Sequence, residues 1–207
     1  MKYLSFFILL FIGELSVNAQ HMFSRQFPFF NQLSSNEIFS IHQDREGYFW
    51  IGTTNGLARY DGYQLNTFRT DYKNQNLLTD NGITAINDND LYVWIGTWKG
   101  LNLYNKQTCQ ITPFSDVRLL DKVVDAITVD KDGNVWVSAG GMIYRCDSTA
   151  HIIKEYEVGN IQEGYAISNI YVDQQKQLWA VGSRGIFRYE PETDSFFRYP
   201  PLGNGHT

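Results

Sequence analysis

Apolar and polar residues alternate along the chain in short runs, and the whole pattern recurs about every 43 residues. The clearest markers are tryptophans at successive spacings of 44, 42 and 43 residues, namely Trp50, Trp94, Trp136 and Trp179. Each is preceded, six residues earlier, by an aspartate: Asp44, Asp88, Asp130 and Asp173. Correlated positions at one period indicate an internal repeat rather than chance.

Each copy of the repeat predicts four short strands. In the first copy, the alternation favours strands over residues 38–41, 48–52, 56–60 and 63–68. Asp-Gly and Asp-x-x-Gly sequences between them are typical of tight turns. No helical period separates the copies, so we predict an all-β chain of four-stranded antiparallel repeats, the pattern of β-propeller blades. A β-sandwich also has short strands, but it has no reason to repeat one Trp in one register.

The repeat also predicts the organisation of the chain. We expect blades over residues 33–72, 78–115, 122–157 and 166–199, after an N-terminal segment, 20–32, that contains a possible closing outer strand. Residues 200–207 resemble a linker to something further. Four blades at the usual curvature form an incomplete propeller arc with uncovered faces, so the isolated chain should self-associate. The alternative is a compact four-bladed ring with its first and fourth blades in contact.

The repeated tryptophans are predicted to be structural. One four-stranded blade cannot bury both of its faces, so a large flat side chain at the same place in every blade fills the gap to a neighbouring sheet. We therefore expect Trp50, Trp94, Trp136 and Trp179 to form core, and the recurring aspartates to form turns.

The N-terminus predicts export. Lys2 precedes an apolar run over residues 3–12, and Val17 and Ala19 provide the small residues of a cleavage site. We predict a signal peptide over residues 1–19, cut near Ala19, and a periplasmic or secreted mature chain. The apolar run is too short to cross a bilayer, so no membrane span is expected.

Composition excludes several kinds of partner and site. The net charge is −5, with 17 basic residues scattered among 22 acidic ones, so nucleic acid is not an expected partner. Two cysteines cannot make a disulfide scaffold, and whether Cys109 pairs with Cys146 stays open. The four histidines are dispersed, and the sequence suggests no metal, cofactor or catalytic set. Asp125 and Asp80 could serve a propeller glycosidase or lyase, but solvated carboxylates are commoner.

Trp98 is the strongest candidate for ligand binding. It lies four residues after a core Trp, in the loop between second and third strands, where propellers usually bind ligands. An exposed indole there can stack on a sugar ring. The alternative is that Trp98 only covers the rim of a neighbouring blade. Weaker candidates stand in the same loops or in the linkers between blades: Lys99, Asn55, Arg184, Tyr72 and Tyr165.

The repeat resembles a known family. Residues 33–62, LSSNEIFSIHQDREGYFWIGTTNGLARYDG, are similar to the two-component regulator propeller repeat, and residues 78–105 are a good second copy. Residues 122–146 and 166–190 match less well. The resemblance implies the periplasmic sensor region of a hybrid two-component histidine kinase.

That family context suggests a function and its partners. The resemblance implies detection of an oligosaccharide, regulation of polysaccharide utilisation, and contact with the remaining blades or sensor domains of a longer protein. No kinase signature occurs in these 207 residues, so any kinase activity would reside in a further C-terminal region. The alternatives are a secreted propeller enzyme, a lyase or a glycosidase, and a scaffold propeller that binds protein.

Overall fold

Antiparallel β-sheets account for nearly all of the regular structure in the computed structural model, which describes residues 29–71, 73, 77–158, 167–183 and 185–199. The expected signal peptide lies outside these residues. Blade 1 contains β1 (Ile38–Gln43), β2 (Phe49–Thr53), β3 (Gly56–Tyr60) and β4 (Leu65–Phe68). Blade 2 contains β5 (Ile83–Asp88), β6 (Tyr92–Thr97), β7 (Gly100–Asn105) and β8 (Gln110–Pro113).

The second half of the chain repeats this arrangement. Blade 3 contains β9 (Val124–Val129), β10 (Val135–Ala139), β11 (Met142–Cys146) and β12 (Ile152–Glu157). Blade 4 contains β13 (Ile167–Val172), β14 (Leu178–Gly182), β15 (Gly185–Glu190) and β16 (Ser195–Arg198). Two single 3₁₀ turns, η1 (Phe30–Gln32) and η2 (Val117–Leu119), complete the elements within the described ranges.

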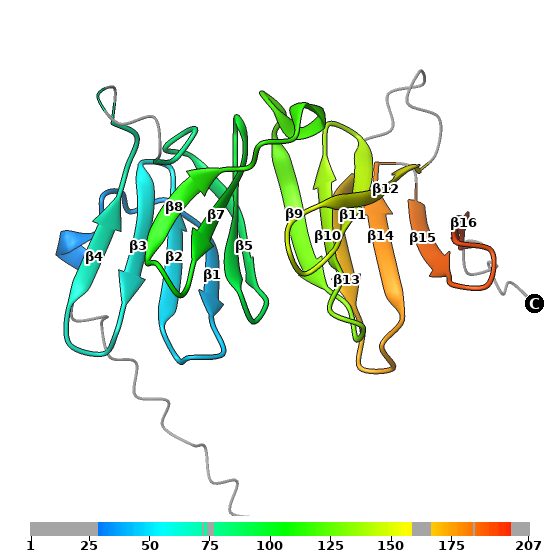
Figure 1. The fold of residues 1–207 in the computed structure, drawn as a ribbon, viewed down its shortest axis with the longest axis horizontal. Helices are drawn as coiled ribbons and strands as arrows, with labels where there is room; N and C mark the ends of the chain where they lie inside the picture. The colour runs from blue at the N-terminus through cyan, green and yellow to red at the C-terminus, as the bar shows by residue number, and fades with distance from the viewer. Residues whose placement is uncertain (1–28, 72, 74–76, 159–166, 184, 200–207) are drawn as a thin grey trace, which may run out of the picture.

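The four sheets form an open propeller arc. In each sheet the strands pair in sequence order. The first strands of successive blades, β1, β5, β9 and β13, lie against one another and form the inner edge. Blade 1 and blade 4 stand at opposite ends of the row (Figure 1). The predicted fold class, all-β with four four-stranded blades, is confirmed, and the compact ring is not formed.

The aspartate of the repeat builds the first turn of a blade. The Oδ1 atom of Asp44 accepts hydrogen bonds from the backbone N–H groups of Glu46 (3.0 Å) and Tyr48 (2.9 Å). Its Oδ2 atom accepts one from Nε1 of Trp50 at 2.6 Å. The six-residue spacing thus joins the turn to the core Trp in a single local unit. Asp130 with Trp136 and Asp173 with Trp179 repeat the bond at 2.8 Å each.

Blade 2 departs from this rule. Its turn is one residue shorter, so Asn89 replaces the aspartate and accepts from the N–H groups of Leu91 and Tyr92. Asp88 is instead the last residue of β5 and pairs in register with Val93. The buried Nε1 of Trp94 consequently has no hydrogen-bond partner. The prediction that Asp88 forms a turn like the other aspartates of the repeat was therefore wrong.

The fourth strand of blade 1 is shorter than predicted. It begins at Leu65, not at residue 63, because the Asp61 carboxylate accepts from the N–H groups of Tyr63 and Gln64. Those bonds extend the turn by two residues and hold the backbone out of the ladder.

The core consists of three apolar layers between successive blades. Trp50, Trp94 and Trp136 each fill one layer and are 0–1% exposed, which confirms their predicted packing role. Trp179 is only half-buried, because no further blade covers its face in the structure.

The two end faces carry exposed apolar side chains. Ile41 and Phe49 are exposed on blade 1, and Val181, Ile186 and Phe197 on blade 4. The ring of Phe29, 5.3 Å from that of Tyr60, covers part of the blade 1 face. Self-association through such surfaces stays a prediction. The possible outer strand over residues 22–30 lies mostly outside the described residues, but its last residue, Phe30, begins the turn η1 and is not in a strand.

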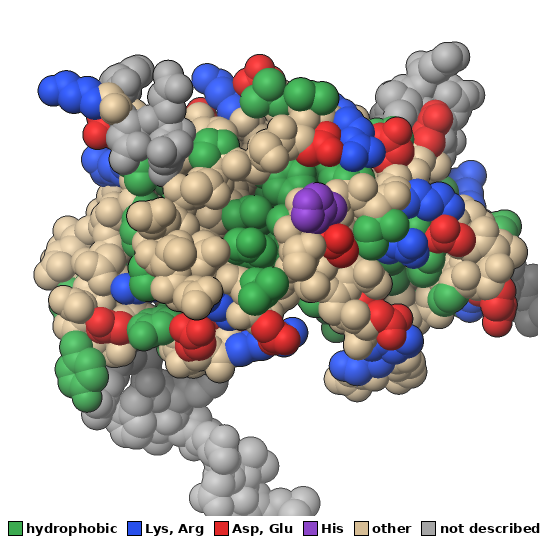
Figure 2. Space-filling model, in the orientation of Figure 1, with side chains coloured by type: hydrophobic (Ala, Val, Ile, Leu, Met, Phe, Trp, Pro, Cys, Tyr) green, Lys and Arg blue, Asp and Glu red, His purple; other side chains and the backbone are tan. Residues whose placement is uncertain are grey.

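The surface is mixed in charge. On the face shown in Figure 2, Lys and Arg side chains alternate with Asp and Glu, and no continuous basic patch is visible. Among the described residues, none forms a helix with the length and hydropathy needed to span a membrane.

Candidate ligand-binding site

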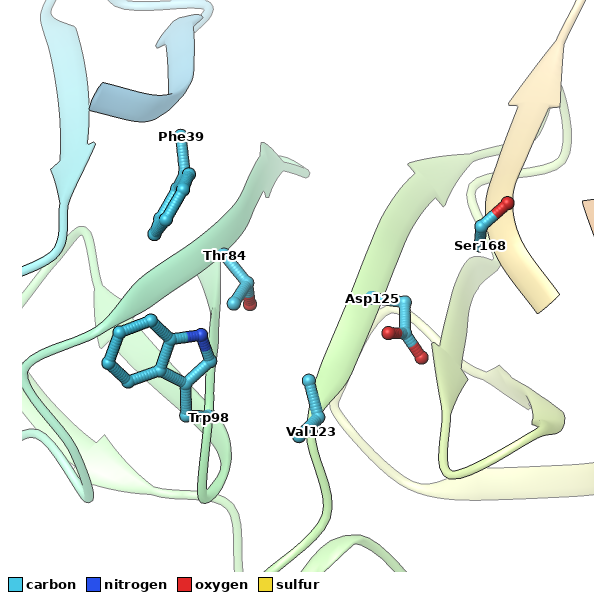
Figure 3. A pocket seen from close by; sticks show the side chains of 6 residues that line it. All are labelled: Phe39, Thr84, Trp98, Val123, Asp125 and Ser168. Atoms are coloured by element: carbon cyan, nitrogen blue, oxygen red, sulfur yellow. The ribbon is translucent and has the colours of Figure 1, made fainter. Parts of the chain in front are cut away.

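A cavity of about 350 Å³ opens at the inner edge of the arc, and we call it the inner-strand cavity. Its lining comes from all four blades: Phe39, Thr84, Trp98, Val123, Asp125 and Ser168. Figure 3 shows the side chains of Phe39, Thr84 and Trp98 on one side, facing Val123, Asp125 and Ser168 across an open space. The volume is near the lower end of the range for small-molecule pockets.

A β-bulge in every innermost strand supplies one lining residue. The pairing of β1 with β2 shifts between Ile38 and Ser40, which leaves Phe39 as the extra residue. The corresponding shifts in β5, β9 and β13 leave Thr84, Asp125 and Ser168. A bulge turns its extra side chain out of the regular alternation of a strand. Four bulges at equivalent positions therefore aim four side chains at one space.

Trp98 forms the aromatic wall from the loop between β6 and β7. Its backbone N–H donates to the carbonyl of Gly82 at 3.1 Å, which fixes the loop over the entry to β5. A Cβ atom at residue 82 would lie 2.4 Å from the indole, so glycine is required beneath the ring. Trp98 is 44% exposed, unlike the buried Trp50, Trp94 and Trp136.

Phe39 extends the aromatic wall from blade 1. Its ring centroid lies 6.1 Å from that of Trp98, at an interplanar angle of 59°. Phe39 is 53% exposed. Trp98 thus covers the rim of its neighbour, as the alternative interpretation expected, while one part of it remains open to a ligand. The two interpretations of this residue are compatible.

Three polar side chains also line the cavity: Asp125 and Ser168 across from Trp98, and Thr84 on the Trp98 side. Asp125 is exposed to the cavity, and the described residues form no ion pair with it. Partial burial raises the pKa of its carboxyl above the usual value. The Thr84 hydroxyl donates to the Val124 carbonyl at 2.5 Å, and the Ser168 hydroxyl donates to the Val181 carbonyl at 3.2 Å. An aromatic wall facing hydrogen-bonding oxygens is a suitable arrangement for a polar ring.

Of the described residues that the sequence singled out for ligand binding, the inner-strand cavity contains Trp98 alone. Lys99 lies beside it in sequence but lines a separate, polar cavity of about 360 Å³, where its Nζ is 3.8 Å from Oδ2 of Asp80. The side chain of Asn55 donates to the carbonyl of Ser34 at 3.2 Å and does not line either cavity. Arg184, Tyr72 and Tyr165 lie outside the described residues.

Sequence reasoning missed Phe39, Thr84, Val123 and Ser168. A signal for the bulge residues was present, because they stand ten or eleven positions before their core tryptophans. Since the four residues are Phe, Thr, Asp and Ser, no single residue type recurs at that position of the repeat. Only the bulge geometry shows that these residues face one space.

Among the described residues, neither the two cysteines nor the potential metal-binding side chains form a further site. Both Cys109 and Cys146 are free, so the open question of their pairing is answered. Burial raises the pKa of the Cys146 thiol to about 12, which keeps it protonated. Within the described ranges, no group of three or more His, Cys, Asp or Glu side chains could hold a metal ion.

Comparison with known proteins supports the repeat and the fold. The family model described as two component regulator propeller matches residues 32–55, in the first blade, so the resemblance read from the sequence is confirmed for this copy. Among curated proteins, none gives a significant match.

Solved propeller structures resemble this chain over most of its length. The extracellular domain of BT4673 from B. thetaiotaomicron is 22% identical, with a TM-score of 0.60 over 75% of this chain and 21% of that one. The extracellular domain of BT3049 from the same organism, assigned to a hybrid two component system, is 21% identical with a TM-score of 0.55. It covers 80% of this chain and 30% of that one.

An enzyme shares the same fold. Virginiamycin B lyase from Staphylococcus aureus is 18% identical, with a TM-score of 0.64 over 81% of this chain and 57% of the lyase. The chain thus spans from about a fifth to less than three fifths of these structures. At such identities the likeness establishes the β-propeller fold, and it does not assign a role, a ligand or a reaction.

Proposed function

We propose that this chain is an exported sensor module that binds an oligosaccharide in the inner-strand cavity and passes the signal by contact with neighbouring domains. The observation that carries the proposal is the set of four equivalent bulges that direct Phe39, Thr84, Asp125 and Ser168 to one space. The regulator propeller repeat and the likeness to extracellular domains of signalling systems support the sensor class.

A sugar suits the two walls of the cavity. The apolar face of a pyranose ring stacks on an exposed indole, and its hydroxyl groups pair with polar side chains at the ring edge. Trp98 offers the indole, and Asp125 and Ser168 offer oxygens across the space. Thr84 offers a further oxygen on the Trp98 side. The choice of an oligosaccharide as the ligand rests on the family resemblance and on this arrangement together.

The cavity also offers a route for a signal. A ligand that fills it contacts side chains from every innermost strand, so it favours one relative placement of the blades over others. Binding energy that differs between two placements is what shifts such an equilibrium. Domains attached to the propeller would sense this change through contact.

Calorimetric titration tests the binding. The mature chain would be titrated with neutral tetrasaccharides of glucose, xylose and mannose, and we expect at least one to bind. Trp98→Ala should weaken that ligand by roughly 1–3 kcal/mol through the loss of the stacked ring. Tyr63→Ala is the matched control, because Tyr63 is 90% exposed in the turn between β3 and β4, away from the cavity. Equal losses in both variants would contradict the assignment.

A propeller lyase or glycosidase is the second candidate function. It is favoured by Asp125, a cavity carboxyl whose pKa is raised by partial burial. Glycoside hydrolysis ordinarily takes a pair of carboxyl groups, whereas Asp125 is the one acid among the six lining residues. Turnover of a bound oligosaccharide that disappears in Asp125→Asn would favour the enzyme. Binding without product supports the sensor.

A further inference from the structure

The hydrogen bonds that the lining residues already make within the protein determine whether the inner-strand cavity offers donors or acceptors to a ligand. A backbone carbonyl can only accept, so the hydroxyl groups of Thr84 and Ser168 must give their hydrogens to Val124 and Val181. What each hydroxyl then presents to the cavity is lone pairs. The Asp125 carboxylate is likewise an acceptor. The three polar side chains of the cavity are therefore all acceptors, and among the six lining side chains only the indole N–H of Trp98 can donate.

The charge of the cavity has one sign. Asp125 is the one ionisable residue in the lining, and no Lys, Arg or His is among the six residues. The nearest basic residues in the sequence are engaged elsewhere. Nζ of Lys122 donates to the Tyr144 hydroxyl at 2.7 Å, and Lys99 faces Asp80 in the other cavity. A ligand carboxylate or sulfate would thus meet a negative charge with no compensating cation among the described lining residues.

The aromatic wall strengthens the same preference. The faces of Trp98 and Phe39 carry the negative part of the ring quadrupole, which attracts a cation held within about 6 Å of the ring centroid. An ammonium group placed between these rings and Asp125 would gain both the ion pair and the ring attraction. A hydroxyl in its place would gain only a neutral-donor hydrogen bond.

We propose that the inner-strand cavity selects amino sugars with a free ammonium group and rejects acidic sugars. The inference rests on the proposed oligosaccharide binding and names the class of sugar. The ring of the sugar would lie on Trp98, with the ammonium group directed at Asp125 and hydroxyl groups donating to Thr84 and Ser168.

Three tetrasaccharides that differ in charge test the selection. Glucosamine, N-acetylglucosamine and galacturonate tetramers would be titrated calorimetrically into the mature chain at about pH 6.5 and about 0.15 M salt. A typical amine is protonated and a typical carboxyl ionised at this pH. We expect the glucosamine tetramer to bind at least about tenfold more tightly than the N-acetylated one, and the galacturonate tetramer to be weakest.

Substitution of the carboxylate separates charge from shape. Asp125→Asn should reduce the preference for the glucosamine tetramer to less than about threefold and leave the affinity for the N-acetylated tetramer nearly unchanged. Asp125→Ser is a second variant in case the first is unstable, and melting temperatures would verify folding. Asp132→Asn is the matched control, because Asp132 follows β9 whereas Asp125 is near its start.

The outcomes distinguish the two proposals. Binding of the N-acetylated or galacturonate tetramer with equal or greater affinity than glucosamine would overturn the selection and leave oligosaccharide binding in place. An unchanged preference in Asp125→Asn would also overturn it, because the charge would then not be the cause. If none of these tetramers and none of the neutral tetrasaccharides binds, the proposed function fails and the selection fails with it.

Discussion

The covered face of blade 1 and the open face of blade 4 carry the same tryptophan and arginine in the same register but have a different environment. On blade 1, Trp50 packs edge-on against Tyr104 of the next blade, with ring centroids 4.8 Å apart at 62°. On blade 4, Trp179 contacts Tyr199, just beyond the outer strand of its own blade, at 5.3 Å. The repeat defines one half of an interface, and a neighbouring blade is needed to bury it.

The arginine of the repeat shows the same difference. Arg59 of blade 1 donates to the Tyr104 hydroxyl, and Arg145 of blade 3 donates to the Tyr189 hydroxyl. Each therefore bridges two blades. Arg188, at the same register in blade 4, forms an ion pair with Glu190 on its own strand. Identical sequence positions thus stabilise an interface in one blade and a surface in another.

The largest expected effect compares the two tryptophans. Trp50→Ala should destabilise the fold by about 3–5 kcal/mol, because it leaves a cavity in a packed layer. Trp179→Ala should cost clearly less, since its side chain is already half-exposed. Both indoles donate to an aspartate, so the hydrogen bond is matched and burial differs. Urea unfolding of the two variants would measure the gap, and equal losses would contradict the comparison.

The next effect concerns acid. Burial opposes the charge of Asp88, but hydrogen bonds from His42 of blade 1 and from Lys106, each at 2.7 Å, lower its pKa to about 2. Because this value is below that of an unfolded aspartate, about 3.9, ionised Asp88 stabilises the fold above about pH 4. The contribution, about 2–3 kcal/mol, should be lost as the pH falls from about 4 to about 2.

Substitution isolates this contribution. Asp88→Asn should lower the stability at neutral pH and flatten its dependence on pH between about 4 and 2. Asp173→Asn on blade 4 is the comparison. The hydrogen bond from Trp179 lowers the pKa of Asp173, but this group lies outside any interface between blades, so a smaller loss is expected. Thermal melts across the acid range would measure both, and an unchanged pH profile in Asp88→Asn would disprove the role of this carboxylate.

The smallest effect compares the two arginines. Arg59→Ala should cost about 1 kcal/mol, because the guanidinium lies over the rings of Tyr48, Trp50 and Tyr104 and donates across the interface. Arg188→Ala should change the stability by less than about 0.5 kcal/mol, since its ion pair is at the surface. A larger loss for Arg188→Ala in chemical unfolding would show that the blade 4 face is covered in solution.

The sequence by itself determined the parts of the molecule that depend on neighbours along the chain. The spacing of Asp44 and Trp50 defines a turn and a hydrogen bond within one hairpin, so the repeat, the strands and the blade class were readable. The exposed Trp98 was also identifiable, because it breaks the pattern of the repeat. Interactions between residues that are close in the chain produce a pattern that can be recognised in the sequence.

The tertiary structure decided what depends on residues from different blades. The residues that line the cavity from the four bulges are of different types, and only the bulges and the curvature of the arc bring them together: Phe39, Thr84, Asp125 and Ser168. The exposure of Trp179 and the hydrogen bond between Asp88 and His42 likewise depend on which blade stands next to each residue. Packing between sheets is non-local, so the same repeated residue can be core in one blade and surface in the next.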